Sequence, residues 1–109
     1  MNNEKNTEMS NISKPCFIMV QVNFKNLEES IQRYGQFAIP IIMKYGGQMI
    51  AGSTSPTSLE GDWAGNWAAI LQFPNKEAAL AFYNADDYKP LLDLRLNELQ
   101  SESRVVMID

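Results

Sequence analysis

The densest group of chemistry-bearing residues is a turn segment in which Glu60 and Asp62 flank a glycine just before Trp63. An indole wall raises the pKa of a nearby carboxylate, which suits such a group to general acid–base work at a cavity mouth. The same residues also suit a structural turn, in which the aspartate caps the backbone and the tryptophan anchors the loop on the core. We favour the structural interpretation, and the sequence alone leaves both open.

Arg95 is the second candidate, because it lies among leucines in the last predicted helix. A guanidinium can hold a substrate carboxylate through two parallel hydrogen bonds. The structural alternative, which we favour, is a buried ion pair or hydrogen bonds to the carbonyl groups of the 59–63 turn. On this interpretation Arg95→Ala disturbs folding more than ligand binding, and a variant with a normal Tm and lost binding would contradict it.

Five further polar side chains are candidates for contact with a ligand. The hydroxyl groups of Tyr34, Tyr83 and Tyr88 can orient a ligand, although aromatic residues at helical spacing are more often core residues with their hydroxyls at the solvent. Gln21 and Gln72 would place neutral amides in a dimer cavity if they share a sheet face with Phe17, Met19 and Ile70. They would then bind a small polar ligand, or only each other and water.

Composition excludes several classes of chemistry. The 109 residues include no histidine, so His-ligated metal and His-based triads are absent, and we expect no metal and no cofactor. Cys16 is the only cysteine, so an internal disulfide is ruled out. We interpret Cys16 as a small hydrophobic residue. Nine scattered basic residues and a net charge of -4 argue against nucleic acid. No apolar run approaches the roughly 20 residues of a membrane span, and we expect a cytoplasmic protein.

The chain divides into a polar tail and one domain. Residues 1–14 lack an apolar period and are predicted to be a disordered tail, and residues 15–109 form a single domain. Apolar runs predict four strands, at 16–22, 48–52, 67–73 and 104–108. Two helical segments lie between them, the first capped by Asn26 and the second opened by Asn75. We expect Pro40 to kink or break the first segment, Gly46 to end it, and the last helix to start at Asp86 or Asp87 and end near Gln100.

This β-α-β-β-α-β order predicts a ferredoxin-like α+β sandwich, with a four-stranded antiparallel sheet and both helices on one face. The helical crossovers predict parallel pairing within each β-α-β half. In the strand at 16–22, the alternate residues that point to one face are all apolar, and those that point to the other face are mostly apolar. Both faces of the strand must therefore be covered. A second copy of the chain is the best candidate for the face without helices, and we therefore expect a homodimer.

The chain resembles the domain of unknown function 1330 family over roughly Phe17 to Ile108. The motifs that carry the resemblance are Tyr34, Pro40, Lys44-Tyr45-Gly46-Gly47, Gly52, Leu59-Glu60-Gly61-Asp62-Trp63, Phe73-Pro74, Glu77-Ala78, Phe82-Tyr83, Tyr88, Arg95 and Arg104-Val105-Val106. The resemblance implies the dimeric α+β barrel superfamily, in which two ferredoxin-like sheets pack face to face. That superfamily includes cofactor-independent monooxygenases, haem-degrading enzymes and muconolactone-type isomerases. The family itself has no settled biochemical function.

Three positions depart from the family pattern. Gln72 replaces the glutamate that usually precedes Phe-Pro, Trp67 stands where a basic residue is common, and Gln21 replaces an acidic residue of the first strand. If those charges serve a general base in relatives, this chain has lost them, and acid–base chemistry is less expected here.

Three functions remain in competition. The first is a homodimer that binds a small organic molecule in a cavity at the sheet or dimer face, without nucleic acid or membrane as a partner. The second is a cofactor-independent monooxygenase- or isomerase-like enzyme that polarises an aromatic or enol-like substrate with Asp62, Tyr83 and Arg95. The third is a structural module that binds a protein partner. The candidate ligand-binding residues are Gln21, Tyr34, Glu60, Trp63, Trp67, Gln72 and Tyr88.

Overall fold

The computed structural model describes residues 14–63 and 65–109, so the predicted polar tail, apart from Lys14, lies outside the described residues. Four strands form one sheet in the order β2-β3-β1-β4. Their bounds are β1 (Cys16–Phe24), β2 (Gln48–Ser53), β3 (Trp67–Phe73) and β4 (Gln100–Ile108). The α+β class and the four-stranded antiparallel sheet are confirmed.

The expected parallel pairing within each half is wrong. All three ladders are antiparallel, because β3 lies between β1 and β2, and β1 lies between β3 and β4. The two strands of each half therefore run in the same direction without being neighbours. The last strand is also longer than expected, since it begins at Gln100 rather than Arg104.

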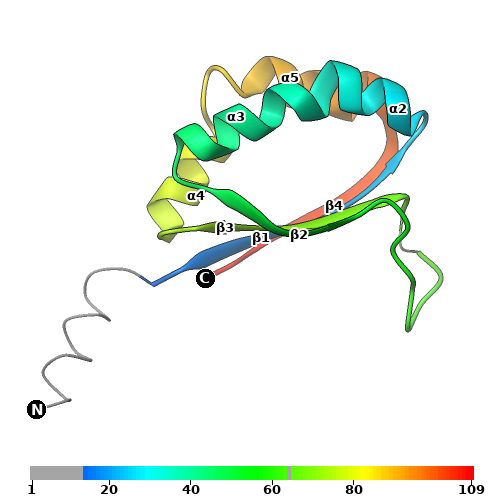
Figure 1. The fold of residues 1–109 in the computed structure, drawn as a ribbon, viewed down its shortest axis with the longest axis horizontal. Helices are drawn as coiled ribbons and strands as arrows, with labels where there is room; N and C mark the ends of the chain where they lie inside the picture. The colour runs from blue at the N-terminus through cyan, green and yellow to red at the C-terminus, as the bar shows by residue number, and fades with distance from the viewer. Residues whose placement is uncertain (1–13, 64) are drawn as a thin grey trace, which may run out of the picture.

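All helical elements lie on one side of the sheet (Figure 1). The first segment comprises α2 (Leu27–Ser30), a π-helix η1 (Ile31–Gly35) and α3 (Gln36–Lys44); the second comprises α4 (Lys76–Tyr83), α5 (Lys89–Leu94) and a π-helix η2 (Arg95–Leu99). Among the residues that the structure describes, no helix is long and apolar enough to cross a membrane.

Local sequence signals explain most of the helix ends. The side chains of Asn26 and Asn75 accept hydrogen bonds from the backbone of Glu29 and Ala78, which confirms both as N-caps. Gly46 follows α3 with a φ of 89°, the left-handed conformation that glycine adopts without strain. The last helix starts at Lys89 rather than at Asp86 or Asp87, and Pro90 lies in its first turn.

The expected break at Pro40 is wrong, because α3 runs through this residue from Gln36 to Lys44. The helix instead changes to π winding one turn earlier, over Ile31–Gly35. Pro40 has no N–H to bond the carbonyl of Gln36, the residue at which α-helical winding resumes. The irregularity therefore falls on the N-terminal side of the proline.

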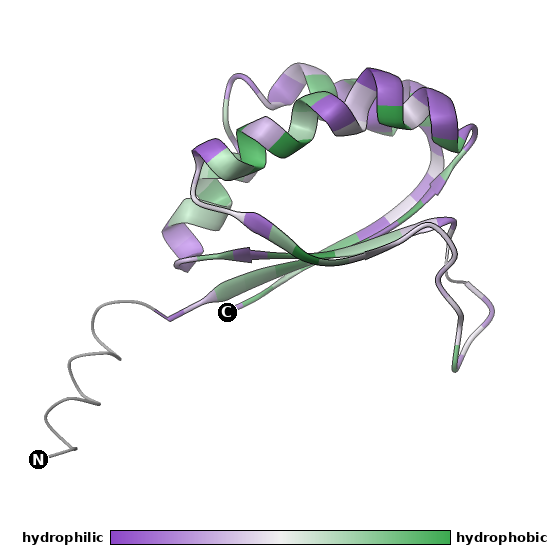
Figure 2. Cartoon of the chain, in the orientation of Figure 1, coloured by the Kyte–Doolittle hydropathy of each residue, from purple (hydrophilic) through white to green (hydrophobic). Residues whose placement is uncertain are grey.

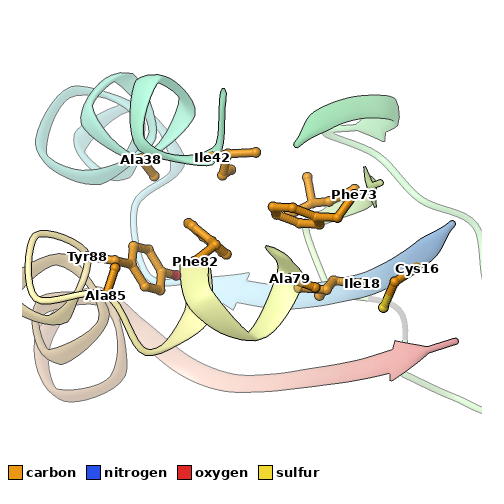
Figure 3. Close-up of a cluster of buried hydrophobic side chains, with 10 residues drawn as sticks. Cys16, Ile18, Ala38, Ile42, Phe73, Ala79, Phe82, Ala85 and Tyr88 are labelled. Atoms are coloured by element: carbon orange, nitrogen blue, oxygen red, sulfur yellow. The ribbon is translucent and has the colours of Figure 1, made fainter. Parts of the chain in front are cut away.

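The core lies between the sheet and the helices. Side chains of β1 and β3 meet α3 and α4 there, and the close-up in Figure 3 shows Phe73 and Phe82 between the two helices and the sheet. These two rings stack with their centroids 5.5 Å apart. Gly47 lies against Phe73 so closely that a Cβ atom there would come within 2.5 Å of the ring, so this turn requires a glycine.

No helix of residues 14–63 and 65–109 covers the opposite face of the sheet, which we call the uncovered face. The register places Phe17 opposite Gln72 and Ile108, and Met19 opposite Ile70 and Val106. Met19, Val106 and Ile108 are 40%, 55% and 48% exposed. Figure 2 shows the middle of the sheet in hydrophobic colours although the chain covers only its upper side. This face is the apolar surface that the parity of the first strand predicts.

The segment between β2 and β3 leaves the sheet on the side opposite to the helices (Figure 1). Its backbone is irregular, with Gly61 at a φ of 86° and the Ser58 hydroxyl donating to the carbonyl groups of Glu60 and Gly61. Leu59 is 93% exposed. The segment therefore projects past the uncovered face instead of folding back over the helices.

Candidate functional site

A partly enclosed hollow lies between the first helical segment and the sheet. It has a volume of about 320 Å³, at the lower end of the roughly 300–1,000 Å³ typical of small-molecule sites. The helical segment contributes Leu27, Ser30, Ile31, Tyr34, Gly35, Gln36, Ala38, Ile39 and Ile42. The sheet and the second segment contribute Val20, Val22, Phe24, Met49, Trp67, Ala69, Leu71 and Arg95. We refer to this hollow as the helix-side cavity.

The sheet presents alternate residues to this cavity. Val20, Val22 and Phe24 share one parity of β1, and the register sets Val20 opposite Ala69 and Val22 opposite Trp67. Small residues at Ala38 and Ala69 leave the space that larger side chains would fill. The cavity is therefore a consequence of small side chains on facing elements, at positions where the core is otherwise closely packed.

Both π-helices border the cavity. Ile31, Tyr34 and Gly35 come from η1, and Arg95 is the first residue of η2. A π turn widens the helix and changes the direction of the side chains that follow, and such turns occur frequently at functional sites. The sequence reasoning missed these turns and missed Ser30, Ala38 and Ala69 as lining residues, because no pattern of residue types marks a π turn.

Arg95 is the charged residue of the cavity wall and is only 3% exposed. Nη1 donates to Oε1 of Gln100 at 2.7 Å, and Nε is buried without a hydrogen-bond partner. The guanidinium carbon lies 5.6 Å from the centroid of the Tyr34 ring. Burial by itself lowers the pKa of Arg95, but the neighbouring Tyr34 and Tyr88 hydroxyls outweigh it and hold that pKa above its usual value. Arg95 is therefore cationic at neutral pH.

The structure differs from our favoured interpretation of Arg95. Within residues 14–63 and 65–109 it makes no ion pair, and no hydrogen bond joins it to the turn at 59–63. The turn lies beyond the other face of the sheet (Figure 1), so a side chain among the helices cannot tie the two together.

Two tyrosines stand beside Arg95. The hydroxyl groups of Tyr34 and Tyr88 are 2.6 Å apart and share a hydrogen bond. Tyr34 lines the cavity, whereas Tyr88 is 3% exposed and lies behind it in the core. Burial, reinforced by Tyr34, raises the pKa of Tyr88 well above the usual range. Tyr83 packs at the edge of this group, its ring centroid 6.1 Å from that of Tyr88, and does not line the cavity.

The acidic turn is not part of the helix-side cavity. Glu60 and Asp62 are exposed, and neither lines it. Trp63 packs on Arg104 of β4, with the guanidinium carbon 4.4 Å from the ring centroid. Ser58 rather than Asp62 makes the side-chain hydrogen bonds of this turn.

Gln21 and Gln72 lie on the uncovered face, on the same parity as Phe17, Met19 and Ile70. The register sets Gln72 opposite Phe17 and Gln21 opposite Arg104. The sequence candidates thus separate into two groups. Tyr34, Trp67 and Arg95 border the helix-side cavity, and the remaining candidates lie in the core, on the uncovered face or in the turn. One chain does not assemble Asp62, Tyr83 and Arg95 at a common site.

No group of three or more His, Cys, Asp or Glu side chains that could hold a metal ion occurs among the described residues. Cys16 is buried, and burial first, with Asp109 nearby, raises the pKa of its thiol. A raised pKa disfavours the thiolate, which is the nucleophilic form. Cys16 is a core residue in this structure.

Comparison with known proteins extends this description. A protein of unknown function from Rhodopseudomonas palustris superposes with a TM-score of 0.72 at 16% identity, over 96% of this chain and 90% of that chain. A dimeric ferredoxin-like protein of unknown function from Thermobifida fusca gives 0.61 at 10% identity, over 86% and 89% of the two chains. A dabb family protein with a ferredoxin-like fold from Mesorhizobium loti gives 0.54 at 8% identity, over 87% and 95%.

These likenesses show the ferredoxin-like fold. The curated proteins include no match to the chain. The model of the family described as domain of unknown function (DUF1330) matches residues 15–108, which is nearly all of the part that the structure describes. The chain therefore belongs to the DUF1330 family, as its motifs indicate.

Proposed function

We propose that two copies of this chain form a homodimer through their uncovered faces, and that each copy binds a small, largely apolar organic molecule in its helix-side cavity. The observation that carries the proposal is the cavity of about 320 Å³ between the sheet and α3. Tightly packed interiors leave few voids larger than a water molecule, and an apolar hollow of this size is suited to an apolar molecule.

Exposed residues at one side of the cavity provide a way in. Ile31, Ile39 and Met49 border it and are 52%, 45% and 38% exposed. They come from η1, α3 and β2, so the opening lies between the first helical segment and the edge strand of the sheet. An apolar rim of this kind admits apolar molecules in preference to strongly hydrated ones.

The apolar residues of the uncovered face support the dimer. Met19, Val106 and Ile108 would remain in water in a single chain, and a second sheet packed on them would remove them from it. The Thermobifida fusca neighbour is described as dimeric. The dimer leaves both helix-side cavities open, because they lie on the other side of each sheet. A cytoplasmic location stays a prediction.

Native mass spectrometry of gently purified protein tests both parts. We expect a mass near twice 12.3 kDa, with a ligand released on denaturation or, after its removal, with added 1-octanol bound. A bare monomer would overturn the dimer, and a dimer that takes up no apolar molecule would overturn the binding site. Ala69→Leu fills the cavity and should lose 1-octanol while remaining dimeric. Ala81→Leu, on the exposed face of α4, is the matched control and should retain both.

A further inference from the structure

The helix-side cavity contains an arginine that has no counter-charge among the described residues. Arg95 is 97% buried, as its exposed fraction of 3% shows, and it forms part of the cavity wall. The ion pairs found among the described residues join other cations to other carboxylates. Arg33, which is near in the fold, already binds Glu29 and Glu98. A buried cation is normally paired, because removing it from water without an anion is strongly unfavourable.

The guanidinium of Arg95 is incompletely hydrogen-bonded within the described part of the chain, although the Tyr34 and Tyr88 hydroxyls lie beside it. Nη1 donates to the neutral amide oxygen of Gln100, whose own Nε2 donates to the Ser103 hydroxyl. Nε has no partner, and in the described part of the chain no hydrogen bond is donated by Nη2. Nε and Nη2 form the side of the guanidinium that presents two parallel N–H groups, the arrangement that matches the two oxygens of a carboxylate.

Apart from Ser30, Tyr34 and Gln36, whose polar groups hydrogen-bond within the chain, the rest of the cavity wall is apolar. Its walls include Val20, Ala69 and Leu71 of the sheet and Ala38, Ile39 and Ile42 of α3. A single fixed positive charge in such walls favours a ligand with one negative charge and an apolar body. It disfavours phosphates and sugars, whose further charges and hydroxyl groups would find no partners here.

We propose that the helix-side cavity binds a small apolar monocarboxylic acid, whose carboxylate pairs with the guanidinium of Arg95 and whose body lies along α3 toward the opening at Met49. This inference rests on the proposed function and defines the chemical class of its ligand. The cavity would hold about ten waters at roughly 30 Å³ each, so an acid of about ten non-hydrogen atoms fits. Octanoate, with its uncharged analogue 1-octanol, is the matched pair of probes.

Gln100 provides the sharpest variant. Gln100→Glu keeps the shape of the side chain and places a carboxylate 2.7 Å from Nη1, where the amide oxygen now lies. The Ser103 hydroxyl can donate to that carboxylate, so the local hydrogen bonds survive. The variant gives Arg95 an internal counter-ion, and it should abolish the preference for an acid without disturbing the apolar walls.

Isothermal titration calorimetry of the full chain at neutral pH provides the test. We expect octanoate to bind at least about tenfold more tightly than 1-octanol, the gain typical of a hydrogen-bonded charge pair. Arg95→Met and Gln100→Glu should remove this difference, and Gln100→Glu should bind 1-octanol as the wild-type chain does. Lys76→Met removes a positive charge from α4, outside the cavity, and should leave the preference intact.

Each other result has a definite meaning. Equal affinity of the wild-type chain for octanoate and 1-octanol overturns the role of Arg95 but leaves the proposed function standing. Binding of neither probe overturns both. Retention of the acid preference in Gln100→Glu overturns the inference even if Arg95→Met fails to fold.

Discussion

Arg95 on the helix-covered side of the sheet and Arg104 on the uncovered face have opposite environments. On the helix-covered face, Arg95 is 3% exposed, hydrogen-bonds a neutral amide and meets no carboxylate among the described residues. On the uncovered face, Arg104 is exposed, lies 4.4 Å from the Trp63 ring centroid and is 3.4 Å from the Glu102 carboxylate. Arg104 is therefore satisfied by the chain itself, whereas Arg95 is not.

The difference indicates what each face is for. A charge that is exposed and paired, as in Arg104, contributes little to stability and is easily solvated at the rim of an interface. A charge that is buried and unpaired, as in Arg95, opposes folding until an anion reaches it. The first pattern is typical of a surface that meets another protein, and the second of a site that meets a small anionic ligand. The predictions below test this contrast.

The largest expected effect comes from the core of the covered face. Phe73 is fully buried and stacks on Phe82, so Phe73→Ala should lower the free energy of unfolding by about 3–5 kcal/mol at any protein concentration. Phe17 lies on the uncovered face, and we expect Phe17→Ala to lower the free energy of unfolding by less than Phe73→Ala does. Its effect should be larger at high protein concentration, where the chain is dimeric, than at low concentration, where the chains are separated. Urea titrations at two protein concentrations measure both. Concentration-independent, equal losses would contradict the contrast between the faces.

A charge on the uncovered face should separate the dimer. Val106 is 55% exposed on β4, and Val106→Glu would place two carboxylates in the middle of the apolar contact between sheets. We expect the variant to sediment as a monomer at concentrations where the wild-type chain is a dimer. Met43→Glu, at a 64% exposed position on α3, is the control and should remain dimeric. A dimeric Val106→Glu protein would place the interface elsewhere.

The contrast between the faces could be predicted from the sequence only in part. The two apolar parities of the first strand correctly predict that the uncovered face is apolar, and the helix caps at Asn26 and Asn75 follow from residue type. These features depend on neighbours in the chain or on a fixed period of two, which a single sequence displays. The pairing of the strands does not follow from the same pattern, because the expected parallel pairing within each half is wrong.

The environment of Arg95 could not be predicted in this way. Its neighbours Tyr34, Tyr88 and Gln100 are brought together by helix packing and by the π turn at η2, and neither leaves a mark in residue spacing. For the acidic turn, in contrast, proximity along the chain suggested a site that the fold does not form at the helix-side cavity. Glu60 and Asp62 are close in sequence to an indole, but the segment projects away from the helix-side cavity, so their proximity along the chain creates no shared site.

The pair of tyrosine hydroxyls beside Arg95 predicts a smaller effect. Tyr34→Phe removes the partner of the buried Tyr88 hydroxyl, which is 2.6 Å away, and should lower the free energy of unfolding by about 2 kcal/mol. Tyr83→Phe is the matched control, because the described residues offer its hydroxyl no hydrogen bond, and it should change stability by less than about 0.5 kcal/mol. Thermal unfolding of the two variants at one protein concentration compares them. Equal effects would show that the hydroxyl pair contributes nothing.

The smallest predicted effect is a loss of stability in alkaline solution. Burial raises the pKa of Tyr88 in the folded chain, so above about pH 10, the usual pKa of tyrosine, the unfolded chain releases a proton that the folded chain retains. The stabilisation is complete well below pH 10 and declines as pH rises, by about 1.4 kcal/mol between pH 9 and 11 for this one group. Urea titrations from pH 9 to 11 measure the decline, and Tyr88→Phe should make it shallower by that amount. An unchanged slope in Tyr88→Phe would mean that another group on the covered face titrates, and that the buried hydroxyl beside Arg95 is open to water.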